Sequence, residues 1–278
     1  MREPMQPSDE ERIRRRASFD GVADVYDWAR PNYPDALLAD LLAESRLDSS
    51  SRVLEIGCGP GLLTRPLAET GASLTAVELG PNLAALARAR LSGFPEVHVV
   101  EADFDRWDAP EGAFDLVVAA TAFHWLDPER RVDACARALV PGGRLAIVDT
   151  HWGVGAEAGR FQFDVQECYA RWNPGYDPSF VPRTLQDLPI RRPELERPDL
   201  FEPPRLRRYS VMRRYFAEEY CGLVQTFSDI LRIESERRAQ FVNCVARLIE
   251  TRFGGAIERT DTYDLWVVRK RNVGRRHE

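Results

Sequence analysis

The chain of 278 residues carries a net charge of −6, with 44% hydrophobic and 29% charged residues. This length can bury a sizeable core, either in one large α/β domain or in a domain with a cap, and the composition excludes a wholly disordered chain. The sequence has no apolar run of about 18 residues that could span a membrane, and residues 1–16 lack the apolar core of a signal peptide. The negative net charge gives no electrostatic reason to expect nucleic acid as a partner. We therefore expect a cytoplasmic globular protein that binds neither membrane nor nucleic acid.

The first 50 residues predict a tail followed by two helical segments. We expect residues 1–18 to form a flexible tail, because charged chain ends are usually frayed. The second helix covers residues 35–45, and two prolines separate it from the first. The residues at helical spacing in the first segment are Phe19, Ala23, Tyr26 and Arg30.

Strands and helices alternate from about residue 50 onward. The expected strands cover residues 52–56, 73–77, 97–100, 114–119 and 144–149. The expected helices cover residues 62–70, 81–91 and 128–139. Short apolar runs that end in turn residues are typical of buried parallel strands, and helix-length connections between them indicate a doubly wound parallel sheet. Together with the N-terminal helices, this α/β core would occupy residues 19–150.

The alternation stops after the fifth strand. Residues 151–206 contain eight prolines and many aromatic residues, which is too apolar for a disordered linker. We interpret them as an inserted cap with one helix near residues 157–172. Residues 207–270 would complete the sheet, and 271–278 would form a flexible basic tail. The elements expected in and around this last part are strands over 206–216 and 261–269 and helices over 218–223 and 234–253.

The cysteines and other metal-binding residue types give no sign of a structural metal. The five cysteines are odd in number, scattered and without a CxxC pair. This argues against a disulfide framework and a zinc site, so we expect reduced, mostly buried thiols and no metal. The cysteines are Cys58, Cys135, Cys168, Cys221 and Cys244.

A glycine-rich loop follows the first predicted strand. Gly57, Gly59 and Gly61 let the backbone approach a ligand at the carboxyl edge of the sheet, where ligands bind. Their GxGxG spacing is not the GxGxxG of dinucleotide sites, and no GK[ST] follows, which excludes a P-loop. Glu78 ends the second strand about 20 residues on, where a ribose diol would be held. By itself this loop leaves open a structural turn, a nicotinamide site or another nucleotide site.

Five sequence blocks narrow the choice. They are VLEIGCGPG, TAVELG, EADF, FDLVVAATAFHWLDP and LVPGGRLAIV, in this order between residues 50 and 150. This set resembles class I S-adenosylmethionine-dependent methyltransferases, above all the bacterial small-molecule branch of trans-aconitate-type and natural-product enzymes. The segment FDGVADVYDWARPNYP extends the resemblance back to Phe19. It implies a Rossmann-like sheet of seven strands with the last one antiparallel, and helical caps.

The resemblance also implies the position of the cofactor. The glycine loop and Glu55 would hold the methionine portion, Glu78 the ribose hydroxyls and Asp103 the adenine amino group, while residues 119–122 would run along the sulfonium. The predicted cofactor-binding residues of the core are Glu55, Gly57, Cys58, Gly59, Gly61, Glu78, Leu79, Asp103, Phe104 and Ala120.

Two histidines are candidates for acid–base chemistry. His124 and His151 follow sheet strands at the ligand edge and could take a proton from an O–H or N–H acceptor. His151 is the weaker candidate. His124 and the neighbouring Trp125 could equally shape the substrate opening without proton transfer, because the sulfonium is already an activated donor. Both interpretations of His124 stay open.

Aromatic residues outside the core are candidates for a lid. Tyr26 and Arg30 would cover the cofactor, with Arg30 pairing to a carboxylate of cofactor or substrate. Tyr33 and Trp152 would contact the substrate. The alternative for the N-terminal cluster is an amphipathic helix that only packs on the core.

The sequence therefore predicts methyl transfer from S-adenosylmethionine to an O, N or C atom of a small molecule, such as a carboxylic acid or a natural-product intermediate. Two alternatives remain, a nicotinamide-dependent oxidoreductase on a similar sheet and a non-catalytic protein that retained the fold. The sequence leaves the acceptor and the oligomeric state open.

Overall fold

A computed structural model describes residues 9–157 and 159–272 of the chain. They divide into two compact units. The sheet unit consists of Asn32–Thr150, Pro189–Tyr209 and the residues from Tyr263 onward. The helical unit consists of the residues up to Pro31, His151–Leu188 and Ser210–Thr262. This division differs from the expected insert over 151–206, because residues 189–206 pack with the sheet and residues 19–31 pack with the helical unit.

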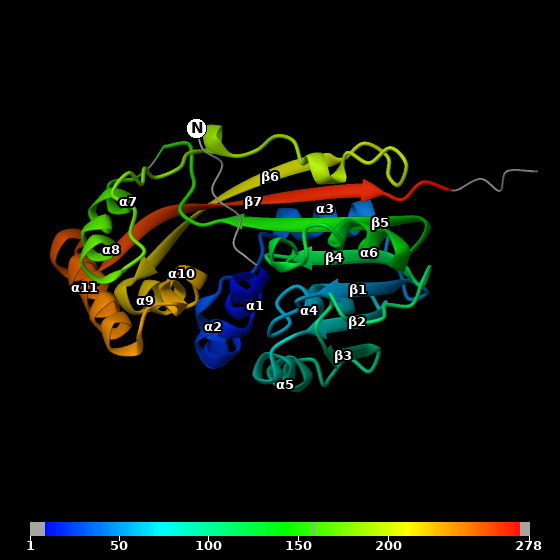
Figure 1. Cartoon of the computed structure of the whole chain (residues 1–278), viewed down its shortest axis with the longest axis horizontal. Helices are drawn as coiled ribbons and strands as arrows, with labels where there is room; N and C mark the ends of the chain where they lie inside the picture. The colour runs from blue at the N-terminus through cyan, green and yellow to red at the C-terminus, as the bar shows by residue number, and fades with distance from the viewer. Residues whose placement is uncertain (1–8, 158, 273–278) are drawn as a thin grey trace, which may run out of the picture. The chain divides into compact units, whose positions relative to one another are not determined.

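The described residues form one sheet of seven strands in the order β3-β2-β1-β4-β5-β7-β6. β1 pairs in parallel with β2 and β4, β2 with β3, and β4 with β5. β7 lies next to β5 in the sheet, and its arrow points in the opposite direction to that of β5 (Figure 1). The predicted sheet with an antiparallel last strand is confirmed. The strands are β1 (Arg52–Ile56), β2 (Ser73–Glu78), β3 (Val97–Glu101), β4 (Phe114–Ala120), β5 (Leu139–His151), β6 (Arg205–Phe216) and β7 (Ala256–Arg269).

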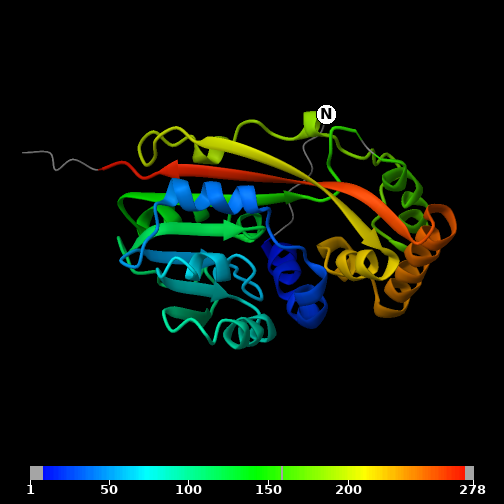
Figure 2. The same ribbon diagram turned by 180° about the vertical axis from the view of Figure 1, so that it is seen from behind.

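Within the sheet unit, α3 and α4 lie on one face of the sheet and α6 lies on the other (Figure 1, Figure 2). Its helices are α3 (Asp35–Ser45), α4 (Thr64–Ala68), α5 (Pro81–Arg90), α6 (Arg131–Ala138) and the 3₁₀ turns η2 (Phe123–Trp125) and η4 (Pro193–Leu195). The helices of the helical unit are α1 (Asp9–Ser18), η1 (Asp20–Val22), α2 (Ala23–Ala29), α7 (Arg160–Asp164), α8 (Gln166–Trp172), η3 (Leu185–Asp187), α9 (Ala217–Gln225), α10 (Ser228–Leu231) and α11 (Ser235–Phe253).

Local sequence explains several of these boundaries. Pro81 opens α5, where its fixed φ suits the first helical turn and its missing N–H costs no hydrogen bond. Glu234 caps α11 by accepting from the backbone N–H groups of the next turn, and Gly254 ends that helix in the left-handed region at φ 65°. β5 is longer than predicted, because the expected turn at 141–143 is part of the strand.

The central strands carry the core of the sheet unit. Leu54 on β1, Val117 on β4 and Ile147 on β5 have no exposed surface and belong to one apolar cluster with Phe123 and Trp266. A strand that is buried on both faces has a continuous run of apolar residues in its sequence, not an alternation of apolar and polar residues. This burial places the carboxyl ends of β1, β2 and β4 side by side at one edge of a rigid sheet.

The helical unit has a core of its own, and it contains a disulfide bond. Phe161, Leu223 and Phe241 are buried in one cluster. Cys168 on α8 and Cys244 on α11 form a disulfide with Cα atoms 5.8 Å apart. The prediction of reduced thiols throughout is therefore wrong for this pair, whereas the other three cysteines are free and buried. The two half-cystines are 76 residues apart and become neighbours only because α8 packs on α11.

The N-terminal segment also differs from the prediction. Residues 9–18, expected as part of a tail, form helix α1, and residues 1–8 and 273–278 of the predicted tails lie outside the described residues. The expected helix over 157–172 is two helices, α7 and α8. No helix in the described part of the chain combines the length and apolar character that a bilayer span needs.

Candidate functional site

The glycine loop after β1 adopts a backbone that favours glycine. Gly57, Gly59 and Gly61 have φ angles of 69°, 55° and 93°, in the left-handed region where L side chains are strained. A Cβ atom added to Gly57 would lie 2.6 Å from the Cβ of Ala122. The loop backbone therefore lies directly against the segment that follows β4, with no room for a side chain at this position.

Glu78 holds this loop in place from the end of β2. Its Oε2 accepts from the backbone N–H of Gly59 at 2.8 Å, and its Oε1 accepts from the N–H of Gly80 at 2.9 Å. The side chain is buried, with 7% of the residue exposed. Hydrogen bonds from N–H groups to a carboxylate are among the stronger ones in proteins. The acid therefore fixes the loops after β1 and β2 relative to each other. Leu79, which follows Glu78 in the chain, is half-buried.

Beneath the loop lies a buried acid, Glu55 on β1. It is 1% exposed, and its Oε2 makes no hydrogen bond to any residue of the described chain. Burial raises the pKa of Glu55 to about 8; the fully buried hydroxyl of Thr64 opposes this rise, and the negative charge of Glu78 adds to it. Glu55 is therefore largely a neutral carboxylic acid at neutral pH.

The neighbouring Cys58 has no reactive thiolate. It is 5% exposed, and its thiol lies 3.5 Å from the carbonyl oxygen of Gly59. Burial raises the pKa of Cys58 well above its ordinary value. The side chain fills space under the loop.

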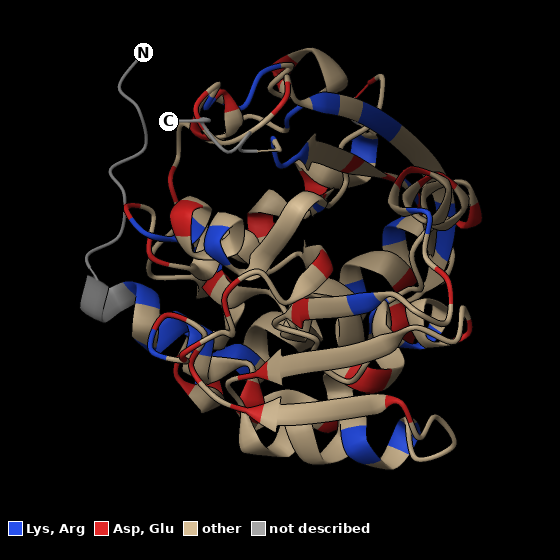
Figure 3. Cartoon of the chain, turned by 90° about the vertical axis from the view of Figure 1, so that its right-hand side faces the viewer, with Lys and Arg blue, Asp and Glu red and all other residues tan. Residues whose placement is uncertain are grey.

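The loop after β3 supplies Asp103 and Phe104. Asp103 Oδ1 accepts from the backbone N–H of Asp105 at 3.2 Å, and its side chain is 22% exposed. Phe104 is buried in the core cluster. Glu78 and Glu101 are paired neighbours at the ends of β2 and β3, and Figure 3 shows acidic residues at the arrowhead ends of strands. This edge of the sheet carries several carboxylates.

A cluster of hydroxyl groups follows β4. Thr121 has φ 56°, which is a rare conformation for a β-branched residue and a mark of local strain. Its hydroxyl lies 2.9 Å from that of Thr150 and 3.5 Å from that of Tyr33. Sequence patterns placed residues 119–122 beside the sulfonium and singled out Ala120, which is half-buried, but they missed Thr150 and the unusual backbone of Thr121. The left-handed conformation of a threonine leaves no signal in a sequence.

The η2 turn carries His124 and Trp125, whose ring centroids lie 4.7 Å apart. His124 is exposed and Trp125 half-buried. Both follow the Thr121 cluster on the same segment, at the carboxyl edge of β4.

The base of the η2 turn, Phe123, is held by two arginines. Their guanidinium carbons lie 4.8 Å (Arg131) and 5.3 Å (Arg192) from the centre of the Phe123 ring. Arg131 also donates to the Phe123 carbonyl oxygen at 3.1 Å. Glu194 accepts from both arginines, and Asp149 accepts from Arg192. This network joins residues far apart in the chain, and no local pattern predicted it.

Four predicted site residues lie in the helical unit. Arg30 donates to the hydroxyl and the carbonyl oxygen of Thr226, both at 2.7 Å. Its guanidinium carbon lies 4.7 Å from the ring centre of Tyr26 and 4.8 Å from that of Trp152. His151 is half-buried. The structure thus groups Tyr26, Arg30 and Trp152 with one another, and groups the residues of the glycine loop with Tyr33, His124 and Trp125 in the sheet unit.

Arg30 has no carboxylate partner among the residues that the structure describes; its contacts are with Thr226 and with aromatic rings. A half-buried guanidinium without an acid keeps capacity to bind one. The described residues also contain no group of three potential metal ligands.

The sequence of this chain is similar to those of known methyltransferases. Residues 54–147 match the family described as a methyltransferase domain. An uncharacterized methyltransferase of Mycobacterium tuberculosis is 34% identical over 131 residues, which are 47% of this chain and 51% of that protein. A ubiquinone biosynthesis O-methyltransferase of Xylella fastidiosa is 40% identical over 102 residues, 36% of this chain and 42% of that protein. The chain thus spans about half the length of the curated relatives it matches.

Solved structures share the fold across most of the chain. The YcgJ protein from Bacillus subtilis has a TM-score of 0.55 at 16% identity and covers 86% of this chain and 99% of its own. A phosphoethanolamine N-methyltransferase 2 from Haemonchus contortus, solved with phosphomonomethylethanolamine and S-adenosylhomocysteine, has a TM-score of 0.54 at 18% identity and covers 97% and 61%. At this identity the likeness shows the fold alone. The segment from β1 to β5 is therefore similar to a methyltransferase domain, and the sheet has the fold of solved methyltransferases.

Proposed function

We propose that this chain transfers the methyl group of S-adenosylmethionine to an O, N or C atom of a small molecule. The observation that carries the proposal is the position of Glu78, which fixes the loops after β1 and β2 at the ligand edge of the sheet. A ribose held there would donate its hydroxyl groups to this carboxylate.

The residues of the sheet unit fit the cofactor. The loop at Gly57 has no room for a side chain against Ala122, as expected where a backbone must approach a ligand. The orphaned Oε2 of Glu55 is suited to accept a hydrogen bond from the ammonium group of the methionine portion, directly or through water. Asp103, Phe104 and Leu79 would line the adenosine side.

When bound, S-adenosylmethionine supplies a methyl group on a positively charged sulfur. The residues of the chain bind the cofactor and the acceptor, orient them and exclude water. Orientation alone can lower the activation barrier by roughly 7 kcal/mol in favourable cases. Ala120 and the strained Thr121 would border the transferred group. His124 would either accept a proton from a hydroxyl or amine acceptor or shape the opening together with Trp125, and His151 is a second proton acceptor to test.

We further propose a carboxylic acid or a natural-product intermediate as the acceptor. Arg30, which lacks an acid partner among the described residues, would bind a carboxylate of the cofactor or the acceptor beside Tyr26 and Trp152. Tyr33 would contact the acceptor next to Thr121. The relative named as a ubiquinone biosynthesis O-methyltransferase supports oxygen as the first atom to test.

The test has two stages. Thermal unfolding with S-adenosylhomocysteine and with NAD separates a methyltransferase from a nicotinamide enzyme, because only a ligand that binds the folded state raises the melting temperature. Incubation with labelled S-adenosylmethionine and a panel of acids, phenols and amines, followed by mass spectrometry, then identifies the acceptor. Stabilisation by NAD alone would refute the proposal, and cofactor binding without transfer to any class of acceptor would favour a non-catalytic protein.

A further inference from the structure

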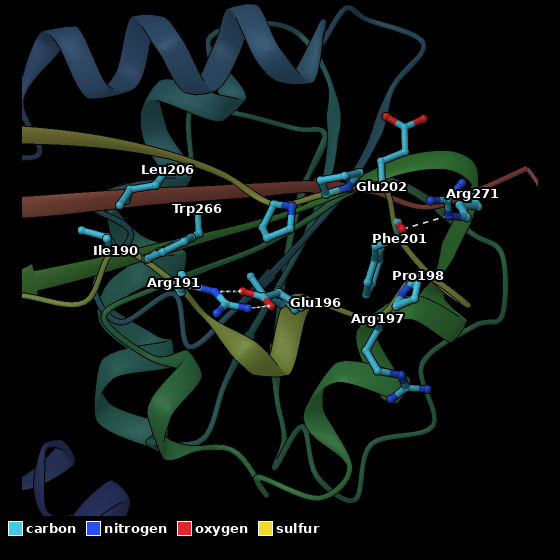
Figure 4. Close-up of a pocket in the computed structure, with 13 residues that line it drawn as sticks. Ile190, Arg191, Glu196, Arg197, Pro198, Phe201, Glu202, Leu206, Trp266 and Arg271 are labelled. Carbon is cyan, nitrogen blue, oxygen red and sulfur yellow. Dashed lines mark hydrogen bonds and ion pairs between the residues drawn. The ribbon is translucent and has the colours of Figure 1, made fainter.

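A pocket lies in the sheet unit, away from the glycine loop. It has a volume of about 430 Å³ and is formed between the segment 190–204 and strands β6 and β7 (Figure 4). One end is lined by Leu206 and Trp266 and the other by Phe201 and Arg271. Volumes of this size are typical of small-molecule sites.

The pocket and the glycine loop lie at opposite edges of the sheet. Arg271 follows the end of the antiparallel β7. Its neighbour Lys270 exchanges backbone hydrogen bonds with Gly142 and Gly143, which precede the continuous run 144–148 of β5 that pairs with β4. This end of β7 therefore lies where the parallel strands begin. The glycine loop follows the carboxyl end of β1.

The walls of the pocket are apolar and held by backbone pairing. Phe201 is 1% exposed and Trp266 2%. The segment beside the pocket pairs with the end of β7, through hydrogen bonds from Glu202 N to Arg269 O and from Arg271 N to Leu200 O. Three prolines in the lining further limit backbone motion. The pocket is thus formed before a ligand arrives.

The charges around the pocket leave one cation without an acid. Glu196 pairs with Arg191, Glu202 pairs with Arg269, and Arg197 pairs with Asp199. The Glu202 carboxylate points away from Trp266 in Figure 4. Arg271 donates through Nε to the Phe201 carbonyl oxygen and has no carboxylate partner among the residues that the structure describes.

The guanidinium of Arg271 carries hydrogen-bond donors and no acceptor, so this end of the pocket favours a ligand group with acceptor oxygens. The five residue steps from Trp266 to Arg271 correspond to roughly 16 Å along an extended chain, so a ligand that fills the pocket is elongated.

We propose that this pocket binds a long-chain aliphatic carboxylate, with the carboxylate on Arg271 and the hydrocarbon chain against Leu206 and Trp266. The apolar walls account for the chain, and the unpaired guanidinium accounts for the acid group. The site is independent of methyl transfer and of the cofactor.

Titration of the full chain with dodecanoate, below its micelle concentration, tests this site by calorimetry. Arg271→Gln removes the ionic partner and should weaken binding about tenfold, the typical effect of losing a hydrogen bond to a charged group. Arg214→Gln removes a charge of the same kind from β6 outside this pocket and should leave the affinity unchanged. Dodecanol, which lacks the charge, should bind the wild type more weakly than dodecanoate.

The position of the chain is tested by fluorescence quenching with 12-bromododecanoate. The bromine should quench Trp266, and Trp266→Phe should remove most of the quenching, whereas Trp107→Phe should leave it. Equal binding of dodecanoate and dodecanol, unchanged affinity of Arg271→Gln, or quenching that persists in Trp266→Phe would each overturn the proposal. The affinity for S-adenosylhomocysteine, measured in the same variants, should stay constant, so a failure of this proposal is distinguishable from a failure of the proposed function.

Discussion

Replacing Glu55 by glutamine should stabilise the protein, and the gain should grow with pH. Below pH 4.5, the ordinary pKa of this group, the carboxyl is protonated in both the folded and the unfolded chain, and the two states do not differ. Between this value and about 8 the unfolded chain loses the proton and the folded chain keeps it. The folded state then binds more protons, so the stability of the wild type falls as pH rises.

The magnitude follows from the pKa difference. Each pH unit of that interval costs about 1.4 kcal/mol, so from the rise to about 8 the buried acid costs on the order of 3 kcal/mol at pH 7. Glutamine keeps the size and cannot ionise. Between pH 5 and pH 8, the difference in unfolding free energy between Glu55→Gln and wild type should grow by about 3 kcal/mol.

Denaturant unfolding at pH 5, 6, 7 and 8 measures this difference. Glu69→Gln is the matched control, because its side chain is 58% exposed and the same chemical change should produce no pH-dependent gain. A difference between Glu55→Gln and wild type that stays constant from pH 5 to pH 8 would refute the reasoning. It would mean that Glu55 is ionised in the folded protein, with water or an ion as its partner.

Three other predictions concern the loop, its acid and the disulfide. Gly57→Ala should lower the unfolding free energy by about 1–3 kcal/mol, the cost of a strained φ, with a further loss from the contact with Ala122; a melting temperature equal to that of wild type would contradict this. Glu78→Ala removes the acceptor for two backbone N–H groups and should weaken S-adenosylhomocysteine binding at least about tenfold, whereas unchanged binding would disprove the ribose assignment. Reduction of the bond between Cys168 and Cys244 should cost about 4 kcal/mol by the loop-entropy argument, and thiol titration of the denatured oxidised chain should find the three free cysteines, against five after reduction. Five thiols before reduction would show that the bond does not form.

Local patterns were sufficient for the parallel part of the sheet. β1 and α3 have the predicted bounds, because an apolar run and a helix that starts after a proline depend on neighbours in sequence. Helix α4 is shorter than predicted and begins only at Thr64, since the tight backbone of the glycine loop extends further. The pairing of residues 142 and 143 with Lys270 keeps an expected turn inside β5, and this contact joins residues nearly half the chain apart.

The predicted site was limited in the same way. The glycines and Glu78 were found because they occur at fixed distances after strands. The disulfide, the arginines around Phe123 and the Thr121–Thr150 contact join residues that only folding brings together. The burial of Glu55 without a partner depends on the packing above it, which residue spacing does not express.

The double hydrogen bond of Glu78 has a consequence for the thermodynamics of cofactor binding. Because the carboxylate already orders the two loops, a ribose would meet a formed surface and would not have to order the backbone itself. Little conformational entropy would then be lost on binding. Amide hydrogen exchange at Gly59 and Gly80 should accordingly be slow before any ligand is added, and the cofactor should change it only slightly.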